Sequence, residues 1–167
     1  MNYGYGDGSG LVAALFVVYA AVFGFALLLV VVGYVLTGFA FMKLFRKVGI
    51  EPWAAWVPYF NIWRILELGG QAGWFVLFSI IPYGGVVTAV FEGIATYRIG
   101  VAFRKSGAWV VLFLFLPFVW AWLLAEDGEV YEPDLIRQRG YGPPLVGYGS
   151  VRGPYVAPQQ PPAPPAG

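Results

Sequence analysis

The sequence predicts an all-α integral membrane protein, and three observations lead to that fold class. Of the 167 residues, 59% are hydrophobic and only 11% are charged, whereas soluble domains carry about 25% charged residues. Three stretches contain no charged residue: 11–42, 72–91 and 106–125. Each reaches the roughly 18–20 residues that a helix needs to cross about 30 Å of hydrocarbon. A soluble fold of this size could not bury so much apolar surface, so we expect lipid to be the solvent for part of the chain.

We predict four transmembrane helices, at about residues 11–42, 50–68, 73–97 and 108–125. Pro58, Pro82 and Pro117 fall within the last three helices and are predicted to kink them near mid-depth, where neighbouring helices satisfy the freed carbonyls. The weakest of the four spans is 50–68, because "EPWAAWVPYFNIW" is short, is broken by proline and is followed by Arg64. The alternative is therefore three spans plus one re-entrant or interfacial helix at 50–68.

The two ends of the chain are predicted to lie outside the transmembrane bundle at 11–125. Glycine occupies every second position from 4 to 10, and residues 1–10 are expected to form a flexible tail. Residues 126–167 are first polar and then rich in proline and glycine, a composition that cannot pack a core. We expect this segment to be a disordered tail that serves as a tether.

Basic residues set the predicted orientation, because short cytoplasmic loops concentrate lysine and arginine. With four spans, the basic clusters at 43–47 and 104–105 fall on the same side of the membrane. The acidic stretch "EDGEVYEPD" falls on the other side. The chain is therefore predicted to be a multi-pass protein of the cell membrane with both termini outside. The residues that set this topology are Lys43, Arg46, Lys47, Arg98, Arg104 and Lys105.

An internal repeat accompanies the basic clusters. "FRKVG" at 45–49 recurs as "FRKSG" at 103–107, and each copy is followed by a tryptophan, a proline-aromatic pair and another tryptophan. A partial third copy runs from Trp74 to the Pro82-Tyr83 pair. The repeat indicates that similar proline-containing units recur along the chain.

Glu92 is the most conspicuous polar residue within the predicted spans, because intramembrane carboxylates are costly and often mark ion or proton pathways. Thr88 and Thr96 lie four residues to either side and share its helical face. The structural interpretation is a carboxylate that reaches the membrane interface or pairs with Arg46, Lys47 or Arg104. Tyr59 and Asn61 follow the predicted kink at Pro58, where their polar atoms are expected to join helices. A site for a small polar ligand is the alternative.

Several of these motifs, read in order, resemble a known family. "WVPYFN", "GWFVLFSIIP", "FRKSGAW", "FLPF" and "EVYEP" are similar to segments of small bacterial membrane proteins that form a family of unknown function, sometimes found in proteins described as type I signal peptidases. The resemblance covers roughly residues 41–133. Pro58, Tyr59 and Asn61 match its Ile-Pro-x-Tyr-Asn motif at a shifted spacing, whereas Gly84 and Gly85 replace an asparagine of its second motif. The resemblance implies a bacterial multi-pass protein and no particular activity.

The sequence favours a non-enzymatic role. Cysteine and histidine are absent, which removes thiolate metal sites and the usual neutral-pH general base, and the net charge of +1 offers no attraction to nucleic acid. We therefore expect no metal and no cofactor. No serine–lysine dyad is apparent either, so we expect no peptidase activity. We predict a scaffold or accessory subunit whose partners are the lipid bilayer and a membrane protein or a second copy. The alternative is a small transporter or channel component that uses Glu92; no small-molecule ligand can be named.

Overall fold

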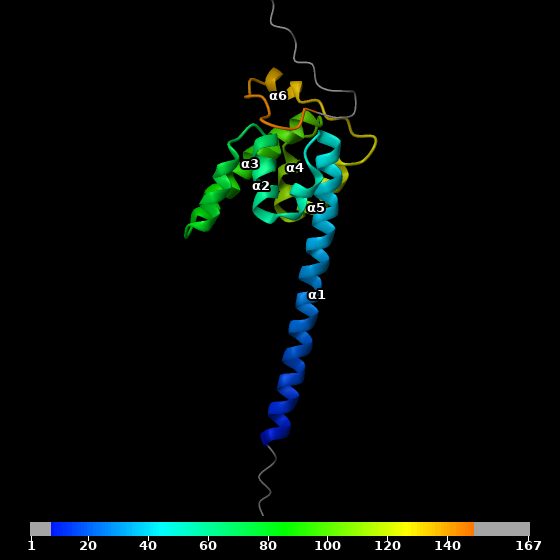
Figure 1. The fold of residues 1–167 in the computed structure, drawn as a ribbon, viewed down its shortest axis with the longest axis vertical. Helices are drawn as coiled ribbons and strands as arrows, with labels where there is room; N and C mark the ends of the chain where they lie inside the picture. Colours follow the sequence, from blue (N-terminus) through cyan, green and yellow to red (C-terminus); the bar gives the residue numbers. More distant parts are fainter. Residues whose placement is uncertain (1–7, 149–167) are drawn as a thin grey trace, which may run out of the picture. The chain divides into compact units, whose positions relative to one another are not determined.

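The structure of the protein, a computed structural model, describes residues 8–148 and is helical over that range, with no strand (Figure 1). The all-α prediction is thereby confirmed for the described residues, whereas the tail predictions for 1–7 and 149–167 fall outside them. The chain divides into two units, 1–37 and 38–167. In chain order, and with η denoting a 3₁₀ helix, its elements are α1 (Gly8–Val48), η1 (Pro52–Trp56), α2 (Pro58–Leu68), η2 (Gly73–Ile80), α3 (Gly84–Ala102), α4 (Ala108–Phe115), α5 (Pro117–Leu124) and α6 (Asp134–Gln138).

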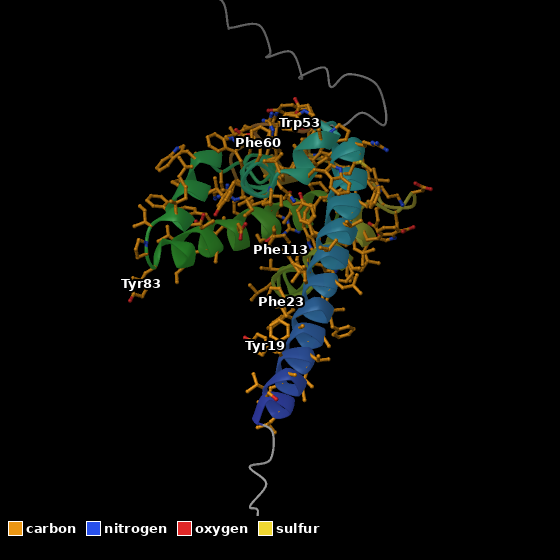
Figure 2. All side chains as sticks on the ribbon, turned by 60° about the horizontal axis from the view of Figure 1, so that its bottom comes forward. Tyr19, Phe23, Trp53, Phe60, Tyr83 and Phe113 are labelled. Atoms are coloured by element: carbon orange, nitrogen blue, oxygen red, sulfur yellow. The ribbon has the colours of Figure 1, made fainter. Side chains whose placement is uncertain are left out.

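The described part of the first unit is an isolated helical segment. Residues 8–36 of α1 contain neither proline nor a charged residue, so nothing interrupts the helix, and every one of them is exposed. Tyr19 and Phe23 project freely from it (Figure 2). By length and composition, α1 and α3 are the two helices among the described residues that are long and apolar enough to cross a membrane.

The second unit contains the end of α1, three helical hairpins and α6. We name them hairpin 1 (η1 and α2), hairpin 2 (η2 and α3) and hairpin 3 (α4 and α5); in each, the two arms pack against each other. One aromatic pair joins the arms of every hairpin. Trp53 stacks on Phe60 with ring centroids 5.0 Å apart, Phe75 stacks on Phe91 at 3.9 Å, and Phe113 meets Trp120 edge-on at 5.1 Å. Two of these six rings, Trp53 and Trp120, are tryptophans of the sequence repeat, and the phenylalanines that complete the pairs lie outside it.

The three prolines lie at the hairpin turns, which corrects the prediction of kinked continuous helices. Pro58 is the first residue of α2, Pro117 is the first residue of α5, and Pro82 lies in the turn that precedes α3. The physical reason is that proline lacks an N–H and fits the first helical position, where no intrahelical bond is needed. As a result, 50–68, 73–97 and 108–125 each contain a chain reversal and do not form one helix.

The outer ends of each hairpin are joined by a basic residue. In hairpin 1, Arg64 Nη2 lies 3.3 Å from Glu51 Oε2, and in hairpin 2, Arg98 Nη1 donates to the carbonyl of Gly69 at 3.3 Å. Hairpin 3 is closed twice. Lys105 Nζ lies 2.6 Å from Glu129 Oε1, and Arg104 Nη2 lies 2.8 Å from Glu132 Oε2. The chain therefore enters and leaves each hairpin at the same end.

Residues 126–148 are ordered and packed, which corrects the prediction of a disordered tail beginning at 126. Ile136 in α6 and Pro144 are fully buried, and the amide of Leu145 donates to the carbonyl of Glu67 at 2.8 Å. The Tyr141 ring lies under the Arg98 guanidinium, 5.1 Å from its centroid. Composition missed this packing because a few apolar residues suffice when a preformed helical surface receives them.

Candidate functional site

The hairpin turns form an apolar surface. We call it the apolar rim, and it consists of large, exposed side chains at and beside the three turns: Val57, Tyr59, Ile80, Ile81, Tyr83, Val86, Leu114, Phe115 and Leu116. Tyr83 is 94% exposed and stands at the outermost point of hairpin 2 (Figure 2). Figure 1 shows the three turns at one side of the second unit and α6 at the other. Large apolar side chains that are exposed together in this way mark a contact with protein or membrane.

The opposite end of the second unit carries its charges. We call this end the charged base, and it contains the closing residues of the hairpins and their neighbours: Lys43, Lys47, Glu51, Arg64, Glu67, Arg98, Arg104, Lys105, Glu126, Glu129 and Glu132. Lys47 Nζ donates to the carbonyl of Leu124 at 3.1 Å and to that of Glu126. The Glu132 carboxylate, which accepts hydrogen bonds from Arg104, raises the pKa of that guanidinium.

Cations at the base also rest on aromatic rings. Lys105 Nζ is 4.8 Å from the Trp109 ring centroid, and the Arg64 guanidinium is 4.9 Å from that of Phe60. Such contacts contribute roughly 0.5–2 kcal/mol, more as they lose water. Burial raises the pKa of the nearby Tyr131 phenol, so that group is neutral at physiological pH. The charged base is therefore held together by ion pairs and by contacts between cations and aromatic rings.

The polar residues singled out in the sequence do not converge on one site. Asn61 Nδ2 donates to the Ala55 carbonyl at 3.5 Å, and Thr88 Oγ1 donates to the Phe75 carbonyl at 3.1 Å. Each bond joins the two arms of one hairpin. Tyr59 is 57% exposed and belongs to the apolar rim.

Glu92 is half-buried on α3, and its carboxylate has no hydrogen-bond or ion-pair partner among the described residues. Thr96 is its neighbour one turn away, but the Thr96 hydroxyl donates to the backbone carbonyls of Glu92 and Gly93, at 2.8 and 3.1 Å. The predicted pairing with Arg46, Lys47 or Arg104 is not formed. Arg46 contacts Met42 Sδ, Lys47 binds backbone carbonyls and Arg104 binds Glu132. Among the described residues, the Glu92 carboxylate is therefore neither hydrogen-bonded nor ion-paired.

Sequence reasoning missed the role of the acidic residues after 125. Glu129 and Glu132 pair with the basic residues that precede α4. A signal for this pairing exists, since the uncharged run 106–125 is preceded by "RK" and followed by "EDGEVYE". Opposite charges at the two ends of an apolar run favour a hairpin that brings those ends together.

The described residues contain no group of three or more His, Cys, Asp or Glu side chains that could hold a metal ion. No curated protein and no solved structure matches the chain. The model of a family of unknown function (DUF5684) matches residues 53–132. That range begins in η1, covers the turns of all three hairpins and ends at Glu132, the last residue that closes hairpin 3. Over its three hairpins, the chain is thus similar to a family of unknown function.

Proposed function

We propose that this chain is a non-enzymatic scaffold or accessory subunit of the cell membrane. The proposal rests on the observation that the polar side chains of the second unit hold its hairpins together. Asn61 and Thr88 join hairpin arms, and the charged base holds the hairpin ends together. What the second unit offers to its surroundings is the apolar rim. A molecule whose polar groups maintain its shape and whose exposed surface is apolar is suited to binding, with lipid as one partner and a membrane protein or a second copy as the other.

The state of the lysines supports a role without peptidase chemistry. A serine–lysine dyad needs a neutral lysine close to the serine hydroxyl. Lys105, the neighbour of Ser106 in the sequence, lies against the Glu129 carboxylate, with Nζ 2.6 Å from Oε1. Ser79 donates its hydroxyl to the Val76 carbonyl at 2.6 Å, within an uncharged stretch. Neither arrangement provides an activated nucleophile.

The test of the scaffold proposal is purification of the full chain in mild detergent, followed by mass-spectrometric identification of what accompanies it. The Ser106→Ala and Glu92→Gln variants serve as matched controls, because each removes a reactive group and leaves the apolar rim intact. We expect one defined membrane-protein partner, or a defined homo-oligomer, in the same yield with all three forms. A partner that is lost from either variant, or a chain that remains monomeric and alone after crosslinking in cells, would contradict the proposal.

A second function, a transporter or channel component, is favoured by one observation: the Glu92 carboxylate has no partner among the described residues. An unpaired intramembrane carboxylate is a feature of proton and cation pathways. Liposomes that contain the protein and a pH-sensitive dye test this function. A flux in the wild type that is absent in Glu92→Gln, and retained in Glu126→Gln at the charged base, would establish the transporter and overturn the scaffold. Equal background traces from all three forms are expected of a scaffold.

A further inference from the structure

We propose that the three hairpins are re-entrant: each enters one leaflet of the bilayer from the side of the charged base, and each leaves on that same side. The apolar rim then rests among lipid acyl chains. Within the described residues, the uncharged part of α1 is left as the single membrane crossing. This interaction surface differs from the four-span topology, in which alternate loops face opposite sides of the membrane.

Closure of the hairpins is the first observation that carries this inference. A segment that crosses the membrane places its two ends about 30 Å apart. The ends of hairpin 3 are joined by Lys105 and Glu129 at 2.6 Å, and the ends of hairpin 1 by Arg64 and Glu51 at 3.3 Å. Hairpin 2 is closed in the same way by Arg98 and the Gly69 carbonyl. None of the three can cross while these contacts exist.

The lengths of the arms match one leaflet. At 1.5 Å per residue, the uncharged part of α2 before Arg64, residues 58–63, extends about 9 Å, and the 8 residues of α4 and of α5 extend about 12 Å. In α3 the uncharged part before Glu92 runs from 84 to 91, again about 12 Å. Half of the hydrocarbon core is roughly 15 Å. The uncharged helical arms are therefore shorter than one leaflet is thick, and each can enter a leaflet without crossing the bilayer.

The backbone at the turns is suited to lipid, where an unpaired N–H is costly. Proline removes this donor at 58, 82 and 117. The neighbouring amides are bonded: Val57 N to Ala54 O at 3.4 Å, Ile81 N to Phe78 O at 3.0 Å, and Leu116 N to Leu112 O at 2.8 Å. The recurring proline of the sequence repeat therefore reduces the number of free donors at the deepest point of each hairpin.

Tryptophan placement identifies lipid as the occupant of the surface. Each hairpin has one half-exposed tryptophan on an arm, between the rim and the base: Trp53, Trp74 and Trp122, at 56%, 49% and 46% exposure. Tryptophan favours the boundary between hydrocarbon and headgroups. One such residue per hairpin, with charges on one side of it and uncharged residues on the other, is the pattern expected where a membrane interface surrounds the unit.

Charge gives the side. All ten lysine and arginine residues lie after residue 42. With α1 as the single crossing, the nine of them that the structure describes fall on the same side of the membrane, which the positive-inside rule assigns to the cytoplasm. The start of α1 then faces outward, and the charged base faces the cytoplasm. The four-span topology instead places the stretch from 126 to 148 outside, away from the basic residues with which it pairs.

Cysteine labelling distinguishes the two topologies, and the chain has no native cysteine. We would introduce single cysteines at Ser9, Gln71, Ser106 and Gln138 and treat intact and permeabilised cells with a membrane-impermeant thiol reagent. Labelling of intact cells is expected at position 9 alone, with the other three labelled at least tenfold more strongly after permeabilisation. Four spans predict labelling of intact cells at positions 71 and 138 as well, and that result would overturn the inference.

Depth measurements test the lipid contact itself. Spin labels at Tyr83→Cys and Phe115→Cys, in purified protein reconstituted into phosphatidylcholine–phosphatidylglycerol vesicles, are expected to relax with oxygen and to be shielded from a water-soluble nickel chelate. A label at Gln138→Cys, near the base, should show the reverse. Access of nickel to the rim would show that it faces water, and shielding from both agents would show that protein covers it; either result contradicts the proposal. These measurements require no partner, so they can fail independently of the scaffold function.

Discussion

Two uncharged stretches of the chain have similar composition and fold differently. Residues 11–37 form a continuous part of α1 and are exposed almost throughout. Residues 108–125 reverse direction at Leu116 and Pro117 and form the two arms of hairpin 3. Hydropathy alone predicts a membrane span for both. The comparison therefore shows that an apolar run long enough to cross a bilayer need not be one helix.

One feature of the sequence separates these stretches. Proline is absent from 11–37 and present in the middle of 108–125. Flanking charge does not separate them, because the uncharged run 8–42 also lies between an acidic residue, Asp7, and a basic residue, Lys43. In 108–125 the proline begins a second arm, and Lys105 and Glu129 meet because the run between them folds back. A proline in the middle of an apolar run is thus the feature that accompanies the chain reversal.

Truncation of two phenylalanines should give the largest contrast between the two units. Phe45 is fully buried in the core of the second unit, whereas Phe23 is 65% exposed in the first. Phe45→Ala is expected to lower the free energy of unfolding in detergent by about 3–5 kcal/mol, because it leaves a cavity, and Phe23→Ala to change it by less than about 0.5 kcal/mol. Thermal unfolding followed by circular dichroism measures both. Equal losses would mean that Phe23 also packs against protein.

Two truncations test whether 134–148 belongs to the folded second unit. Removal of everything after Pro133 exposes the surfaces that bury Ile136 and Pro144 and breaks the bond from Leu145 to Glu67. We expect a loss of about 2–4 kcal/mol, since burial of one such side chain contributes roughly 1.5–3 kcal/mol. Removal of everything after Tyr148 is the matched control and should leave the melting temperature unchanged. Identical melting curves for the two truncated proteins would show that 134–148 is a dispensable tail.

Two glycines provide a smaller test of close packing between hairpins 1 and 2. A Cβ at Gly69 would collide with the backbone of Ala95, whereas a Cβ at Gly85 would meet nothing within 4 Å. Gly69→Ala should therefore cost about 1–3 kcal/mol of stability. Gly85→Ala should be neutral or stabilise by up to about 1 kcal/mol, because alanine favours helix. If Gly69→Ala proves as harmless as its control, the end of α2 does not rest on α3.

The smallest expected effect concerns the closure of hairpin 3. Both partners of the Lys105–Glu129 pair are partly buried, with 20% and 28% of their side-chain surfaces exposed. Glu129→Gln should cost about 1–2 kcal/mol, since it removes a charge-assisted hydrogen bond. Asp127→Asn, a nearby change that breaks no hydrogen bond of this hairpin, should cost less than about 0.5 kcal/mol. A double-mutant cycle with Lys105→Met measures the coupling, and a value of zero would show that the pair does not close the hairpin.

Several properties could be predicted from the sequence because they depend on composition and local pattern. The helical fold class and the helix over 11–42 follow from long uncharged runs, in which a helix is the structure that satisfies every backbone group. The repeat of basic cluster, tryptophan and proline-aromatic pair correctly marked recurring units. Asn61 and Thr88 were recognised as polar residues within apolar surroundings, although the atoms that they bind could not be named.

Tertiary structure alone decided which ends meet. Whether proline kinks a helix or begins a new one depends on whether a second arm is available for packing, as Phe113 and Trp120 illustrate in hairpin 3. The acidic residues after 125 read as a solvated tail until Glu129 and Glu132 are placed beside Lys105 and Arg104. Local propensity acts over a few residues, whereas ion pairs and aromatic contacts join residues that the sequence separates by twenty or more. The sequence by itself therefore determined that the hairpin segments are apolar and helical. Long-range contacts determined where the chain reverses and which ends meet.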